Sequence, residues 1–183
     1  MTLGIVILAL VTLQRLGELW LSNRNTRFLL AQGAHEVGAS HYPLIIGVHF
    51  WWLALLWWLA PGRPIDGWLL AAFVLLEIAR VWILATLGRR WTTRIVVRPG
   101  ARLVTSGPYH FFDHPNYIVV VGEIAALPLV FGLWQIALLF SILNAAVLAI
   151  RIREENRALG RARTSDAGGQ SGGVADPKRR SGL

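Results

Sequence analysis

Long apolar runs separated by short polar connectors make up the hydrophobic pattern of this 183-residue chain. At 1.5 Å rise per residue, a helical run of about 20 residues covers roughly 30 Å, the thickness of a bilayer core. The pattern predicts five membrane-spanning helices, at residues 3–21, 44–60, 68–87, 118–133 and 135–150. The predicted fold class is therefore all-α, a polytopic membrane helix bundle.

The predicted spans form one integral-membrane domain over residues 1–159. The connector at 88–117 is too long for a simple turn, and it holds two short apolar stretches, 94–97 and 102–105, around a Pro-Gly pair. This pattern is typical of a small hairpin or an extended ordered loop, where function often lies. From 160 to 183 the composition shifts to Gly, Ser, Ala and Asp with basic residues, which predicts a disordered basic tail.

Charge is scarce and unevenly placed. Only 15% of residues are charged, against about 25% in ordinary soluble domains, and basic residues exceed acidic ones by 18 to 10. Arginines gather in the connectors 22–42 and 88–117 and after residue 150, whereas 61–67 and the 132–133 turn are poor in charge. The positive-inside rule then predicts an N-terminus outside and a C-terminus in the cytoplasm.

Composition also excludes several classes of function. The apolar N-terminus lacks a basic segment and a cleavage site, so we expect a retained first helix instead of a signal peptide. The chain has no Cys, so it has no disulfide framework and no thiol nucleophile, and we expect no metal site. The high pI comes largely from arginines in the connectors that flank the predicted spans. It is therefore no sign of nucleic-acid binding, and we expect no nucleic-acid partner.

A few charged residues fall inside the predicted spans, where hydrocarbon makes them costly. Arg15 and Glu18 are three residues apart, as are Glu77 and Arg80, so each pair shares a helix face and could neutralise itself. From the sequence alone, these four residues could either form ion pairs that hold the helices together or take part in a functional site. Glu123 has no basic neighbour on its own helix and must find a partner elsewhere, which makes it a candidate site residue.

Polar residues concentrate in the loop before the fourth span and in the helix after it. On a continuing helix, Asn144, Arg151 and Glu155 are spaced seven and four apart and lie on one face. A carboxylate binds ribose hydroxyls, an Arg binds a carboxylate, and Tyr117 with His114 could flank an adenine. Such groups suit an amino-acid nucleoside such as S-adenosylmethionine, although a merely solvated interfacial helix is the alternative from these residues alone.

Three motifs then follow in order: Gly107-Pro108-Tyr109, His114-Pro115-Asn116-Tyr117 and Arg151-Ile152-Arg153-Glu154-Glu155. With two closely spaced spans between the second and third motifs, residues 105–159 resemble the isoprenylcysteine carboxyl methyltransferase family. These proteins are integral-membrane methyltransferases that use S-adenosylmethionine.

The N-terminal part is similar to a bacterial branch of that family, associated with type III polyketide synthases and with O-methylation of alkylpyrones or alkylresorcinols. This similarity implies a bacterial inner membrane. The motifs that carry this similarity are Arg15-x-x-Glu18, Ser22-x-Arg24-Asn25, His41-Tyr42-Pro43 and Arg90-Trp91-Thr92-Thr93-Arg94.

The resemblance implies which residues form the site. The implied cofactor pocket, built from the cytoplasmic loop and the C-terminal helix, comprises Gly107, Pro108, Tyr109, His114, Pro115, Tyr117 and Glu155. We expect Arg151 to hold the anionic acceptor oxygen, with Glu123 or Glu154 positioning it, so these three are the catalytic candidates. The expected partners are a lipophilic small-molecule acceptor and the lipid bilayer, and the sequence leaves the oligomeric state open.

The predicted function is methyl transfer from S-adenosylmethionine to a carboxylate or an acidic enol or phenol oxygen of a lipophilic acceptor, either isoprenylcysteine-like or alkylpyrone-like. One alternative is another membrane enzyme of similar layout, a phospholipid N-methyltransferase or an NADPH-dependent sterol-type reductase. A further alternative is a non-enzymatic membrane scaffold or transporter.

Overall fold

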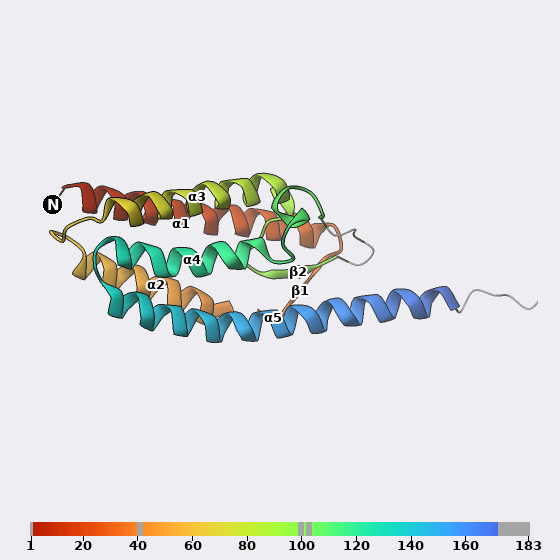
Figure 1. The fold of residues 1–183 in the computed structure, drawn as a ribbon. Coiled ribbons are helices and arrows are strands. Elements are labelled where there is room, and N and C mark those ends of the chain that lie inside the picture. The colour runs from red at the N-terminus through yellow and green to blue at the C-terminus, as the bar shows by residue number, and fades with distance from the viewer. Residues whose placement is uncertain (1, 40–41, 99–100, 102–103, 172–183) are drawn as a thin grey trace, which may run out of the picture.

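The computed structural model describes residues 2–39, 42–98, 101 and 104–171, and side chains of this part as far as residue 154. Helices dominate it and the one sheet is small, so the predicted all-α membrane bundle is confirmed (Figure 1). In chain order the described elements are α1 (Thr2–Ala31), β1 (His35–Val37), α2 (Tyr42–Leu59), α3 (Gly67–Leu87), η2 (Gly88–Arg90), β2 (Ile95–Val97), η3 (Gly107–His110), α4 (Pro115–Val130) and α5 (Trp134–Ser171).

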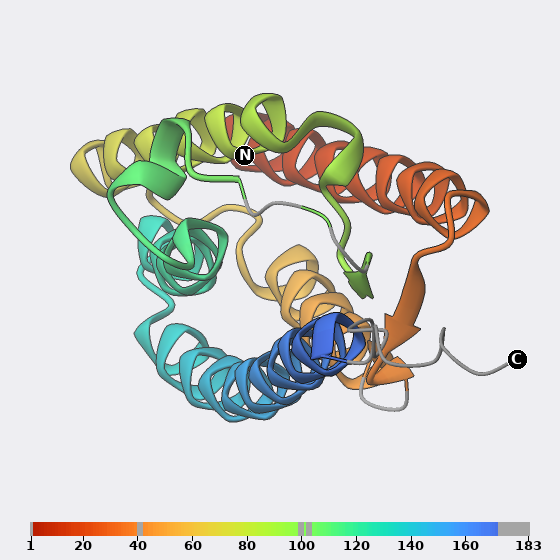
Figure 2. The ribbon, with the colours of Figure 1, turned by 90° about the vertical axis from the view of Figure 1, so that its right-hand side faces the viewer.

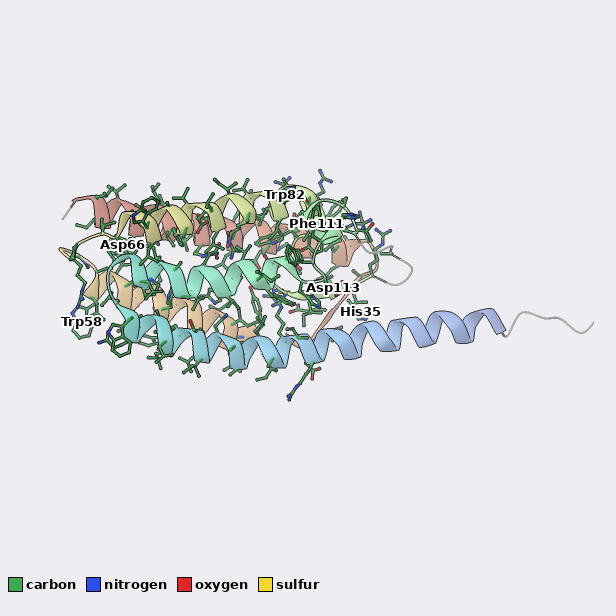
Figure 3. The ribbon with its side chains drawn as sticks, viewed as in Figure 1. His35, Trp58, Asp66, Trp82, Phe111 and Asp113 are labelled. Atoms are coloured by element: carbon green, nitrogen blue, oxygen red, sulfur yellow. The ribbon has the colours of Figure 1, made fainter. Side chains whose placement is uncertain are left out.

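The helices run along a common direction in a bundle. α4 packs against α3 and α5, α2 packs against α5, and α1 contacts α2. Figures 1 and 2 show α1 and α3 on one side, α5 on the other, and the strands and η3 together at the end away from the N-terminus. We call this the loop end; Figure 3 places His35, Phe111 and Asp113 there and Trp58 and Asp66 at the opposite end.

The outer surface of the bundle is apolar. Within the described residues, α1, α2, α3 and α5 are long and apolar enough to cross a membrane, while α4 is a shorter apolar helix. Large side chains such as Leu13, Leu75 and Ile142 face outward, whereas the charged Arg80 and Glu123 are buried. This arrangement suits a bilayer, in which the surroundings are apolar and polar side chains face the bundle interior.

Close packing and hydrogen bonds hold the helices together, because the hydrophobic effect does not drive helices to associate within a bilayer. Gly122 of α4 lies so close to Leu76 of α3 that an added Cβ would be 2.8 Å from Leu76 Cδ2. Trp52 of α2 is fully buried, and its indole N–H donates to the Ile124 carbonyl of α4 at 3.2 Å. These contacts hold α2, α3 and α4 around one interior.

The first helix extends ten residues past its predicted end, to Ala31. Arg24 and Arg27, which indicated a connector, are exposed on one face of this extension, whereas Ser22, Asn25 and Thr26 are buried on the other. The extension is stable as a helix because its inward polar face bonds to another segment, which apolar periodicity does not detect.

For the long loop the sequence predicts a small hairpin or an extended ordered loop, and the strand pair that its described residues form is with a different connector. β2 pairs antiparallel with β1, with His35 opposite Val97 and Val37 opposite Ile95. The pairing partner therefore comes from the connector after α1, and the other apolar stretch, 102–105, lies partly outside the described residues. α5 continues as a helix past residue 160 to Ser171, into the predicted disordered tail, whose residues 172–183 lie outside the described residues.

Candidate functional site

Four charged side chains form a buried ion cluster in the bundle interior: Arg15 and Glu18 of α1, Arg80 of α3 and Glu123 of α4. Arg15 bonds to Glu18 at 2.8 Å and to Glu123 at 2.6 Å. Arg80 Nε donates to Glu123 Oε1 at 2.6 Å, its Nη2 donates to Oε2, and it lies 3.5 Å from Glu18. Two cations and two anions balance, as burial in a low-dielectric interior requires.

The cluster settles the pairing left open by the sequence. The Arg15–Glu18 pair forms as predicted, but the Glu77–Arg80 pair does not, because Arg80 turns toward Glu123 on α4 while Glu77 accepts a hydrogen bond from Gln14. Glu123 finds its basic partners on α1 and α3.

A cavity of about 420 Å³ lies beside this cluster. Its wall includes Arg15, Glu18 and Arg80 at mid-bundle and continues to Arg151 at the loop end. Most of its surface is apolar and comes from α1 and α2. The lining side chains Leu16 and Phe50 are 58% and 62% exposed, so the cavity reaches the lipid-facing surface.

The segment after η2 forms one wall of the cavity and is fixed by the polar face of α1. Ser22 Oγ accepts a hydrogen bond from the Thr93 backbone N–H at 2.8 Å, and Asn25 Nδ2 donates to the Trp91 carbonyl at 2.8 Å. The hydroxyls of Tyr42 and Thr93 bond at 2.9 Å. These residues come from three of the N-terminal motifs, so the motifs meet in space to build this wall.

Arg151 lies at the loop end of the cavity and is held in place by two hydrogen bonds. Its Nε donates to the Tyr117 hydroxyl at 3.0 Å, and its Nη1 donates to the Thr93 carbonyl at 2.6 Å. The His114 and Tyr117 rings stack on each other with centroids 5.2 Å apart and planes at 21°. The two rings therefore lie against each other in this arrangement, and their role in holding an adenine stays a prediction.

The catalytic candidates occupy three different surroundings. Arg151 lines the cavity. Glu123 is bonded to Arg15 and Arg80, so the structure does not place it to orient Arg151. Glu154 is half-buried on α5, three residues after Arg151. The catalytic roles of these residues stay predictions.

The implied cofactor residues are spread beyond the cavity wall. Gly107, Pro108 and Tyr109 form η3, which packs on α3; Gly107 lies against Thr86, and Tyr109 joins a buried group that includes Trp91. Their cofactor role stays a prediction.

The rest of the implied pocket lies at the start of α4 and on α5. Pro115 is the buried first residue of α4, where its fixed φ suits a helix start, and it presents His114 and Tyr117 on either side. Tyr117 lines the cavity, and the side chain of Glu155 lies outside the described residues.

Several cavity residues were not among the predicted site residues. Within the described part of the chain, four buried polar atoms on the cavity wall have no hydrogen-bond partner: Arg15 Nε in the ion cluster, and Asn116 Oδ1, Asn144 Nδ2 and Trp91 Nε1. His49 of α2 also lines the cavity. The available signal for His49 was an ionisable residue within a predicted span, which is by itself a sign of function.

Comparison with known proteins places this geometry in a family. The model of the isoprenylcysteine carboxyl methyltransferase (ICMT) family matches residues 68–161, from the start of α3 into α5. The uncharacterized protein YpbQ of Bacillus subtilis (strain 168) is 42% identical over 159 residues, which cover 84% of this chain and 95% of that protein. No solved structure matches the chain significantly.

Proposed function

The chain belongs to the isoprenylcysteine carboxyl methyltransferase family, and we propose that it is an O-methyltransferase that uses S-adenosylmethionine and a lipophilic acceptor. Family membership and the apolar helices make it an integral membrane protein with methyltransferase chemistry. The donor, the acceptor oxygen and the residues that serve them are the content of the proposal.

The loop end of the cavity fits the polar part of the donor. S-adenosylmethionine carries a carboxylate, an ammonium, ribose hydroxyls and an adenine, and it needs both donors and acceptors. The unpaired atoms on this wall supply both kinds: Asn144 Nδ2 and Trp91 Nε1 donate, and Asn116 Oδ1 accepts. Arg151 adds a guanidinium suited to a carboxylate, and the Tyr117 ring offers an aromatic face.

We assign Arg151 to the donor carboxylate in this proposal. It lies with Asn116 and Tyr117 at the loop end, whereas the charged groups at mid-bundle are those of the ion cluster. The Arg-rich loop end faces the cytoplasm in the proposed orientation, where a water-soluble donor is available.

The mid-bundle part of the cavity fits the acceptor. Its apolar wall from α1 and α2 reaches the lipid-facing surface, so an alkyl chain would lie between these helices while the polar head reaches the ion cluster. A lipophilic acceptor would thus enter from the bilayer.

The chain's own contribution to the reaction is alignment and exclusion of water. S-adenosylmethionine supplies an activated methyl group when bound, so no protein nucleophile is required. The two halves of one cavity bring a cytoplasmic and a membrane ligand together, and such positioning accounts for much of the rate of a two-substrate reaction. The buried walls keep water from competing for the methyl group.

The single observation that carries the proposal is this joint cavity, polar at the loop end and open to lipid at mid-bundle, in a chain of a methyltransferase family. It is tested by calorimetric titration of S-adenosylmethionine into the purified protein in detergent. We expect saturable binding that is competed by S-adenosylhomocysteine and not by NADPH.

A matched pair of variants, Arg151→Ala and Arg153→Ala, makes the titration specific to the site. Arg151→Ala removes the guanidinium assigned to the donor carboxylate and should bind more weakly. Arg153→Ala, which removes an exposed guanidinium two residues after Arg151, should bind as the wild type does. No binding by the wild type, or competition by NADPH alone, would reject the proposal, and the second result would favour a reductase.

A further inference from the structure

We propose that His49 is the catalytic base that takes the proton from a hydroxyl acceptor in this cavity. The inference rests on the proposed O-methyltransferase function and adds a residue to it. His49 lies on α2 and lines the cavity together with Arg15 and Arg80 of the ion cluster and its own neighbour, the exposed Phe50. It belongs to none of the three motifs that define the C-terminal resemblance.

One ring nitrogen of His49 forms a hydrogen bond within the protein, which leaves the other ring nitrogen to face the acceptor. Nδ1 lies 2.8 Å from the carbonyl oxygen of Ile45, one turn earlier on α2. A carbonyl oxygen only accepts hydrogen bonds, so Nδ1 carries the hydrogen and donates it. In the neutral ring with this tautomer, Nε2 keeps its lone pair and is the proton acceptor.

The carboxylates near His49 are poor alternatives for this role. Glu18 and Glu123 each form ion pairs with both Arg15 and Arg80. Taking a proton onto either carboxylate would break a buried ion pair, which costs several kcal/mol. Protonation of His49 at Nε2 would leave all of these bonds intact.

The charges around His49 also suit a reaction in which a proton leaves the acceptor oxygen. The developing oxyanion would lie beside the guanidinium groups of Arg15 and Arg80, which line the same cavity as His49 and stabilise negative charge. The titratable or charged groups that face this cavity are Arg15, Glu18, Tyr42, Arg80, Tyr117 and Arg151, with Glu123 directly behind the two guanidinium groups.

The proposed step balances. The O–H bond of the acceptor breaks and its proton moves to His49 Nε2. The oxygen forms a bond to the methyl carbon of the sulfonium donor as the carbon–sulfur bond breaks and its electron pair stays on sulfur. The products are a methyl ether, a neutral thioether and an imidazolium, which returns its proton to solvent.

This assignment makes the need for His49 depend on the acidity of the acceptor. A phenol is protonated at neutral pH, with a pKa of about 10, and needs the base. An acidic enol or a carboxylate arrives already ionised and does not. We therefore expect His49 to matter for alkylresorcinols and to matter little for hydroxypyrones.

The test uses His49→Asn, because the Asn amide can still donate to the Ile45 carbonyl while no base remains. The variant is assayed with pentadecylresorcinol and with a hydroxypyrone carrying the same alkyl chain. We expect kcat/KM to fall by about 10²- to 10⁴-fold for the resorcinol and by less than about threefold for the pyrone. The wild-type resorcinol profile should rise with pH to a plateau, and the variant should lose that ionisation.

His35→Asn is the matched control, since His35 is exposed on β1, away from the cavity wall. It should keep wild-type rates with both acceptors. Equal losses for the two acceptors in His49→Asn would mean that His49 is structural, and unchanged resorcinol rates would mean that it is not the base. Either result would overturn the proposal.

A second readout needs no methyl transfer. A long-chain nitrophenol, whose acidity is close to that of an imidazolium, is bound without donor at a pH below the pKa of the free phenol. It should show the longer-wavelength absorbance of its phenolate in the wild type and in His35→Asn, and not in His49→Asn. Absence of the phenolate signal in the wild type would also reject the base. If the wild type shows the signal but methylates neither acceptor, the proposed function fails and the proton transfer stands.

Discussion

Charged residues inside this bundle act through the partners that the fold gives them. Arg151 is held by the Tyr117 hydroxyl and the Thr93 carbonyl, from α4 and from the segment after η2. Arg15 and Arg80 share two carboxylates across three helices. The guanidinium of Arg151 thus remains accessible from the cavity, whereas Arg15 and Arg80 belong to a charge-balanced cluster beside it.

Replacing Arg151 by Ala should weaken S-adenosylmethionine binding by about 10- to 100-fold, because charge-assisted hydrogen bonds are worth about 1.5–3 kcal/mol. The dissociation constant is measured by calorimetry. Arg153→Ala serves as the control, and equal affinities for the two variants would show that Arg151 does not contact the donor.

Replacing Glu123 by Gln should destabilise the protein by about 3–5 kcal/mol, because the change leaves two buried guanidinium groups with one carboxylate. Thermal unfolding in detergent measures the effect. Glu36→Gln removes the partner of a half-buried pair, in which Arg94 lies 2.9 Å from Glu36, and it should cost about 1 kcal/mol or less. A Glu123→Gln variant as stable as Glu36→Gln would contradict the account of the cluster.

The sequence reveals which residues are costly to bury, but not which of them meet. The i,i+3 rule found Arg15–Glu18 and misassigned Arg80, because the partner of Arg80 is 43 residues away on a helix whose rotation is set by packing at Gly122. His49 was missed because it is a single ionisable residue in an otherwise apolar run, and only the cavity shows what it faces.

At the scale of elements, short polar segments determine the shape of the loop end. The apolar periodicity located every span to within a few residues at the end away from the loops. It failed where α1 continues to Ala31 and where β2 pairs with β1, since both depend on contacts between distant segments. Local sequence patterns carry no information about such partners.

The docking of η3 on α3 gives a prediction at this scale. Gly107 and Gly132 both have positive φ, 59° and 68°, so an Ala at either position should cost about 1–2 kcal/mol in backbone strain. At Gly107 the added Cβ would also lie 2.6 Å from Thr86 Oγ1, whereas nothing lies within 4 Å at Gly132. Gly107→Ala should therefore lose about 1–3 kcal/mol more, in thermal unfolding, than Gly132→Ala.

Equal losses for the two alanine variants would show that η3 does not pack against Thr86 as described. A greater loss for Gly107→Ala would support a rigid attachment of the Gly107-Pro108-Tyr109 motif to α3.

At the scale of the whole molecule, the loop end and the lipid-facing opening give the two ligands separate routes to one cavity. The chain has no native Cys, so single introduced cysteines report its orientation cleanly. Pro64 and Arg98 are both exposed. Pro64 lies in the connector between α2 and α3, and Arg98 directly follows β2, so they mark opposite ends of the bundle (Figure 1). In intact spheroplasts, an impermeant maleimide should label Pro64→Cys, and Arg98→Cys only after permeabilisation.

The reverse labelling pattern would place the loop end outside the cell. It would separate the donor site from cytoplasmic S-adenosylmethionine and would contradict the proposed route of the donor.

The central claim is that this cavity joins a methyl donor from water to an acceptor from the bilayer. The most direct measurement is methyl transfer by purified protein in lipid vesicles, with methyl-labelled S-adenosylmethionine in the buffer and a long-chain hydroxypyrone or alkylresorcinol in the bilayer. We predict a labelled methyl ether, identified by mass spectrometry, formed in equal amount with S-adenosylhomocysteine and reduced in Arg151→Ala at donor concentrations that saturate the wild type. No labelled product from either acceptor or from a lipid extract would contradict the account.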